Sequence, residues 1–267
     1  MKIKNIFFVL VGVSLAISLF SCGGGDNNKI ENKKLQPFLL CGVYTLGGYG
    51  GGEQYTEAIK QRITTEPGSK QFLKDLSDAY DAYFIFPFKT SDKAGAKREL
   101  ASWWGNDSKE KLTETLDWLL KEGHQTTYES CRKAIDENGG ANADIAAIDL
   151  AKYGLDNNDI ADLRFVRENL DKFPKGGIKA WDIARYMYNV NLGYATEYFS
   201  EEDGQKIAQK ALEEAQKHFD NWDDYWNSYL LGYHFWGGDR SEAFSGLVND
   251  MLNKENQYNI YNYLNIK

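Results

Sequence analysis

Six large aromatic side chains recur at helical spacing near the end of the chain, and this feature limits the fold more than any other. Counted from the first, they lie at offsets of 0, 3, 4, 7, 11 and 14: Trp222, Tyr225, Trp226, Tyr229, Tyr233 and Trp236. Such offsets place side chains along one face of an α-helix. A bare aromatic face of this size promotes aggregation, so we expect it to be packed in a helical core.

The same face allows a second interpretation, in which part of it is a binding surface. Aromatic rings can stack against sugars or form the anchor residues of a protein interface. The partner would then be a carbohydrate or a protein. The residues concerned are Trp181, on an earlier helix, and four in the aromatic run itself: Trp222, Trp226, Tyr229 and Trp236.

Helix signals dominate the rest of the chain as well. Asp107–Glu110 has the pattern of an N-terminal cap, and Gly123 ends the helix that follows. Equivalent signals predict further helices over residues 126–138, 144–153, 159–173, 178–199, 200–219 and 241–252. One stretch, 83–88, has an extended pattern, but Pro87 argues against a central strand. We expect an all-α fold, a single globular, bundle-like array of about eight to ten helices with short loops.

The first residues have the pattern of a bacterial lipoprotein signal peptide. Lys2 and Lys4 precede an apolar run, Ile6–Phe20, which is short for a transmembrane helix and suits a signal-peptide core. Small Ser21 then precedes Cys22 in a segment that resembles the lipobox, where the cysteine becomes N-terminal and is acylated. We therefore predict a signal peptide over residues 1–21 and a lipid anchor, such as palmitate, on Cys22.

The segment that follows Cys22 is too polar and glycine-rich to fold by itself. We interpret residues 22–34 as a flexible tether and residues 35–267 as the helical domain. A lipid-anchored chain belongs to the bacterial cell envelope. Gly23, which follows Cys22, is not an acidic retention signal, so we favour attachment to the outer membrane. Whether the domain lies on the periplasmic or the outer face of that membrane is left open.

The charge of the chain excludes one class of partner. Its net charge is −8, and removal of Lys2 and Lys4 with the signal peptide gives −8 − 2 = −10. The basic residues are scattered, whereas nucleic-acid binding needs them clustered, so we expect no nucleic-acid partner. Apart from Cys22, the cysteines are Cys41 and Cys131, and both lie in apolar patterns typical of buried thiols; a disulfide between them is left as the lesser alternative.

Three segments together are similar to a known bacterial family. The first contains Trp104-Gly105 and Glu122-Gly123-His124, the second Ala180–Arg185 with Gly193–Ala195 and Ser200–Glu202, and the third Asn221–Tyr225, Ser228–Gly232 and Phe235-Trp236. Their order and spacing resemble the family known as domain of unknown function 1266, over roughly residues 95–238. The resemblance implies a helical fold and brings no established reaction.

One charged pair is the leading candidate for a site. Asp182 and Arg185 lie three residues apart on a predicted helix, so their side chains can meet, and Trp181 is placed for a cation–π contact with Arg185. The pair either lines a cleft or fixes how its helix docks, and we favour the docking role. No metal-ligand pattern is present among the three histidines, and no cofactor motif occurs.

These features favour a lipid-anchored binding or interaction protein over an enzyme. No serine-nucleophile motif is present. The alternative is a hydrolase of envelope polymers that uses a carboxylate, with Asp182 or Glu201 as the first candidates.

Overall fold

The computed structural model describes residues 29–238 and 241–267, and within these residues it is all-α, as expected, with no strand. Seven short 3-10 helices lie between or beside the α-helices. The eleven α-helices are α1 (Gly42–Gly48), α2 (Gly52–Lys60), α3 (Lys70–Phe84), α4 (Lys93–Trp104), α5 (Lys109–Lys121), α6 (Gln125–Glu137), α7 (Ile160–Glu168), α8 (Lys179–Ala195), α9 (Glu201–His218), α10 (Trp222–Phe235) and α11 (Ser241–Leu252).

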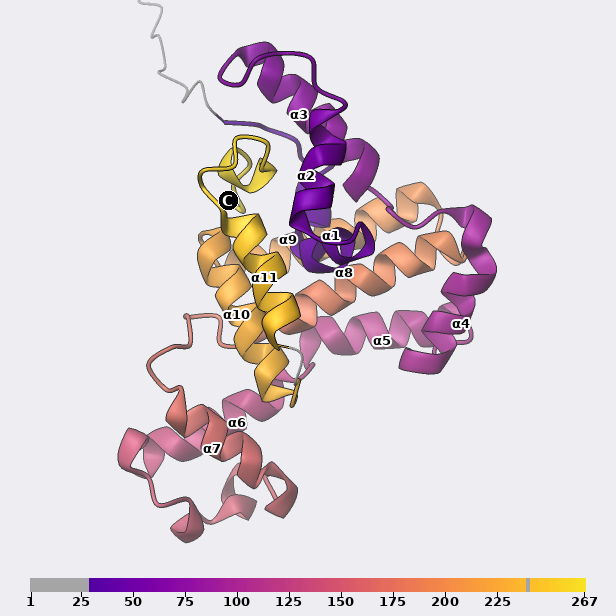
Figure 1. The fold of residues 1–267 in the computed structure, drawn as a ribbon. Helices are drawn as coiled ribbons and strands as arrows, with labels where there is room; N and C mark the ends of the chain where they lie inside the picture. Colours follow the sequence, from indigo (N-terminus) through magenta and orange to yellow (C-terminus); the bar gives the residue numbers. More distant parts are fainter. Residues whose placement is uncertain (1–28, 239–240) are drawn as a thin grey trace, which may run out of the picture.

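Helix α8 forms the centre of the fold. Fifteen of its 17 residues are buried, as expected of a helix that is covered on all sides. Helices α4, α5, α9 and α10 and the 3-10 helix η1 (Gln36–Cys41) pack around it, and Figure 1 shows α8 running through the middle of the upper body. Helix α10 comes closest at Gly232, where a Cβ atom would lie 2.3 Å from Cβ of Trp181.

The aromatic face of α10 lies mostly in the core. Trp222, Tyr225, Trp226, Tyr229 and Tyr233 are buried, whereas Trp236, just after the last turn, is 54% exposed. The core prediction is therefore confirmed for most of the stripe. The alternative of a continuous aromatic surface is wrong, because Trp181, Trp222, Trp226 and Tyr229 have no accessible ring face to offer.

Two predicted helices are shorter than their patterns indicated. Residues 144–153 contain two 3-10 helices, η4 (Ile145–Ala147) and η5 (Leu150–Tyr153), because the Asp144 carboxylate accepts from the nearby Ala146 N–H. Helix α7 ends at Glu168, since the Asn169 side chain donates to the Phe165 carbonyl. In both places a short polar side chain competes with the helical backbone.

Helices α6 and α7 and the 3-10 helices between them form a lobe with its own hydrophobic cluster. Figure 1 shows this lobe projecting below the main body. Cys131 is buried in the lobe and Cys41 in the main core, and both thiols are free. Burial raises the pKa of each thiol to about 12, so both are inert, as their apolar surroundings indicated.

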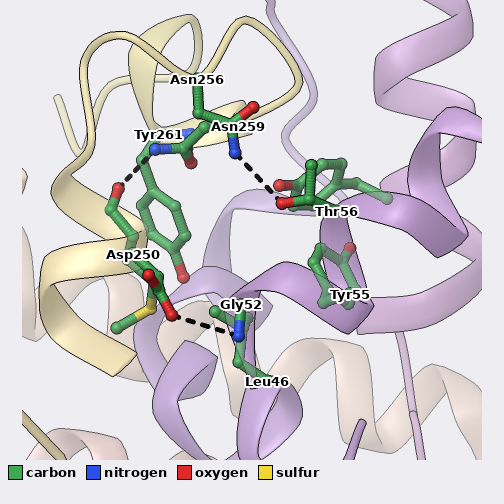
Figure 2. Close-up of a pocket in the computed structure, with 10 residues that line it drawn as sticks. Leu46, Gly52, Tyr55, Thr56, Asp250, Asn256, Asn259 and Tyr261 are labelled. Carbon is green, nitrogen blue, oxygen red and sulfur yellow. Dashed lines mark hydrogen bonds between the residues drawn. The ribbon is translucent and has the colours of Figure 1, made fainter. Parts of the chain in front are cut away.

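The C-terminal segment joins the N-terminal helices. The Asp250 carboxylate accepts from the Gly52 N–H at 3.2 Å, and the Asn256 amide donates to the Thr56 hydroxyl at 3.1 Å, as Figure 2 shows. A side chain at position 52 would collide with Asp250, so glycine is required there. The cavity beside these contacts holds only about 10 Å³, the size of one water molecule.

The predicted signal peptide, Cys22 and the start of the tether lie outside the described residues. Within the part that the structure describes, no helix combines the length and apolar character needed to cross a bilayer.

Replacing Trp226 with alanine should cost about 3 to 5 kcal/mol, because a fully buried ring is removed. The matched control is Trp103→Ala, since Trp103 is 80% exposed and its loss should change stability by about 0.5 kcal/mol or less. Urea unfolding of the two variants measures both values. Equal destabilisation by both substitutions would contradict the core assignment.

Candidate functional site

The first turns of α8 hold the junction between α5 and α6. The Asp182 carboxylate accepts from the backbone N–H groups of His124, at 3.1 Å, and Gln125, at 3.0 Å. It thereby caps α6 from another helix. Lys179 Nζ donates to the Leu120 carbonyl at 2.6 Å, near the end of α5. An anion at a helix N-terminus and a cation at a C-terminus both suit the helix dipoles.

The turn at this junction requires glycine. Gly123 has φ +60°, a left-handed conformation that other residues adopt only at a cost. A Cβ atom there would also lie 2.2 Å from Asp182 Oδ2. The turn and the carboxylate therefore fit together only because position 123 has no side chain.

Arg185 completes the arrangement. Its Nη2 donates to Asp182 Oδ1 and lies 2.8 Å from Nδ1 of His124, while its Nε donates to the Trp181 carbonyl at 3.2 Å. A guanidinium has only donors, so Nδ1 must accept and His124 is the neutral tautomer with its proton on Nε2. The expected meeting of Asp182 and Arg185 is present, and their side chains are 0% and 9% exposed.

The carboxyl of Asp182 stays ionised. Burial alone would raise its pKa, but the Arg185 guanidinium and the N–H groups of His124 and Gln125 stabilise the charged form, so the pKa lies below its ordinary value. A buried carboxylate whose oxygens already accept hydrogen bonds is a poor general acid or base. The pair lies buried beside the α5–α6 junction, and the docking role favoured from its spacing stays a prediction.

Four tryptophans surround the Arg185 and His124 side chains, and we call them the tryptophan cluster: Trp104, Trp118, Trp181 and Trp236. The Arg185 Cζ atom lies 4.5 Å from the Trp181 ring and 5.8 Å from the Trp104 ring. Trp118 packs on His124 at 5.6 Å, and Trp236 packs on Trp181 at 5.8 Å. Trp118 is 39% exposed and Trp236 54%, so the cluster reaches the surface.

The cluster offers accessible groups at its surface end only. The indole N–H of Trp181 is buried without a hydrogen-bond partner and cannot be reached from outside, whereas Nη1 of Arg185 makes no hydrogen bond to any described residue. The arrangement can therefore offer the ring faces of Trp118 and Trp236 to a partner. It offers no nucleophile and no accessible carboxylate.

Glu201, the other carboxylate considered for hydrolysis, lies elsewhere. It is exposed in the first turn of α9 and pairs with Lys34 at 3.1 Å. The structure therefore does not join Glu201 to the Asp182 site.

Sequence reasoning did not identify His124, Trp118 or Lys179 as members of this site. The available signal was the Glu122-Gly123-His124 segment at the end of a leucine-rich helix. A glycine followed by histidine at a helix end marks a tight turn, but it does not show which distant carboxylate caps the next helix.

Replacing Asp182 with asparagine should destabilise the protein by about 3 to 5 kcal/mol near neutral pH, because Arg185 is left buried without its charge partner. The pKa of Asp182 is lowered in the folded state. The stabilisation by its carboxylate is therefore fully present above a pH of about 3.9, the ordinary pKa, and is lost as the pH falls through the lowered pKa. In urea unfolding, the difference from wild type should be constant above about pH 5 and should shrink as the pH falls below about 4. The control is Asp117→Asn in an exposed pair, with a cost of about 0.5 kcal/mol. A pH-independent difference would refute this assignment.

Comparisons with known proteins place the chain among bacterial proteins of unknown role. It is similar to the uncharacterized protein YbeR of Escherichia coli (strain K12), with 23% identity over 172 residues, which span 59% of this chain and 65% of that relative. It is also similar to the uncharacterized protein YbeU of the same organism, with 24% identity over 153 residues, spanning 56% and 61%. The match thus covers less than two thirds of either relative. No solved structure matches.

The family model described as "Protein of unknown function (DUF1266)" matches residues 99–265, which contain the whole of the α5–α6 junction, α8 and α10. The chain belongs to this family.

Proposed function

We propose that the protein is a lipid-anchored component of the bacterial cell envelope whose helical domain binds a partner and does not catalyse a reaction. The anchor is supported by the sequence: basic Lys2 and Lys4, the apolar run 6–20, and Cys22 after small Ser21. The net charge of −8 would repel an anionic membrane, so a covalent lipid is a sound means of attachment.

The binding role is supported by the tryptophan cluster. Tryptophan and arginine are the residues that most often dominate the free energy of protein interfaces. Here Trp118 and Trp236 are exposed beside a rigidly held guanidinium. A protein or carbohydrate partner could stack on these two rings.

Replacing Cys22 with alanine should release the folded protein from membranes, because the proposed lipid is its means of attachment. Cells grown with labelled palmitate should incorporate the label into the wild-type protein and not into the variant. Ser21→Ala keeps a small residue before the cysteine and should still be labelled. Lack of label in the wild type would remove the anchor from the proposed function.

Replacing both Trp118 and Trp236 with alanine should weaken partner capture by about tenfold or more while the fold is kept, because both rings are exposed. The measurement is cross-linking of the wild-type and variant lipoproteins in intact cells, followed by quantification of the captured material. Tyr49→Ala is the matched control, since Tyr49 is 38% exposed and contacts no member of the cluster. Unchanged capture by the double variant would show that the cluster is not the binding surface.

A further inference from the structure

A surface hollow of about 390 Å³ lies between the segment that precedes α4, α4 itself and the last turns of α8. Its wall combines charged and polar side chains with an apolar part, to which Phe88, Ala96, Leu192 and Ala195 belong. This volume is within the range of small-molecule sites. The hollow shares no lining residue with the tryptophan cluster, so it is a separate feature of the fold.

One carboxylate in the wall of the hollow has no charge partner among the described residues. Glu99 lines the hollow and is half-buried. It accepts a hydrogen bond from the Tyr188 hydroxyl, but no lysine or arginine nitrogen of residues 29–238 or 241–267 lies within 4.0 Å of it. A partly buried charge that lacks a counter-charge is costly, and a bound cation would remove that cost.

The charge of the hollow is set by Glu99. Burial, and then the neighbouring Glu99, raise the pKa of Tyr188, so the phenol remains a neutral donor. At the rim, Lys89 and Asp92 carry opposite charges. The Asp92 carboxylate already accepts from the Gly95 N–H as the cap of α4.

Aromatic rings lie beside the carboxylate. The Tyr188 ring packs edge-to-face against Phe88 at 5.5 Å and in a tilted arrangement against Tyr44 at 4.6 Å. Aromatic rings next to a carboxylate attract organic cations through both the ring quadrupole and the charge.

The walls of the hollow are fixed in place. Phe86 and Glu197, which border the lining segments, have φ angles of 48° and 60°, rare values for residues other than glycine. The Phe86 ring is held by stacking on Tyr194 at 4.1 Å, and Glu197 is held by an ion pair with Lys93. Such strained backbone persists only where the surrounding contacts determine it.

We propose that this hollow binds an organic ammonium ion, with Glu99 as the counter-charge, Phe88 and Tyr188 beside the cation, and the apolar part of the wall against the body of the ligand. This goes beyond the proposed function, because it assigns a second site with its own ligand class.

The test is calorimetric titration of the full-length lipoprotein in non-ionic detergent with benzylammonium. Benzyl alcohol and benzoate have the same ring with a neutral or negative head group. We expect saturable binding of benzylammonium, at least about tenfold weaker binding of benzyl alcohol, and none of benzoate. Equal affinity for benzylammonium and benzyl alcohol, or no saturable binding of benzylammonium, would overturn the proposal.

Glu99→Gln keeps the size of the side chain and an acceptor for Tyr188 but removes the charge, so benzylammonium should bind at least about tenfold more weakly. Glu114 is an exposed acid outside the hollow, so Glu114→Gln should bind benzylammonium as tightly as the wild type does. Wild-type affinity in Glu99→Gln would refute the role of the carboxylate. Because the Trp118 and Trp236 double variant should keep benzylammonium binding, failure here and failure of the proposed partner surface are separable results.

Discussion

The carboxylate of Asp182 is the group on which the arrangement of the other site residues depends. It joins two helices, because it belongs to α8 and caps the first N–H groups of α6, and it also pairs with Arg185 of its own helix. Together with Lys179 at the end of α5, it fixes the turn at Gly123 and so the positions of Trp118 and His124. A buried ion pair is weak evidence for stability in itself, but removing one partner is costly. Its value here is that it allows only one way of docking α5 and α6 on α8.

The hydrogen bonds of the aromatic core are satisfied unevenly. Near η1 and the C-terminal segment, three polar edges have partners: Tyr225 donates to the Leu40 carbonyl, Tyr261 to Leu39 and Trp222 to Leu264. The indole N–H groups of Trp181 and Trp226 are buried without a partner among the described residues. Each such group costs about 1 to 3 kcal/mol. Both indole rings pack on Tyr229, at 5.4 and 5.5 Å, so the two unsatisfied groups share one neighbour.

Local signals predicted most of the fold. Features that depend on neighbours in the sequence could be predicted. They are the Ser108 and Ser200 caps, the glycine at the end of α5 and the aromatic face of α10. The Asp182–Arg185 contact was predictable for the same reason, since three residues span less than a helical turn. The capping of α6 by Asp182 was not predictable, because Asp182 lies 58 positions from His124 and 57 from Gln125 in the sequence. Spacing also could not show which end of the aromatic face of α10 leaves the core. Trp236 is exposed because α10 ends at Phe235, one residue before it.

The overall charge affects the two proposed sites in opposite ways. An acidic protein raises the local concentration of cations, and this effect would assist an ammonium ion approaching Glu99. The same field opposes an anion approaching Arg185, whose own charge is already balanced by Asp182. Recognition at the tryptophan cluster must therefore come mainly from ring contacts and N–H groups rather than from net attraction. Because Arg185 and Tyr188 both belong to α8, a helix buried along almost its whole length, the two sites are held at a fixed separation.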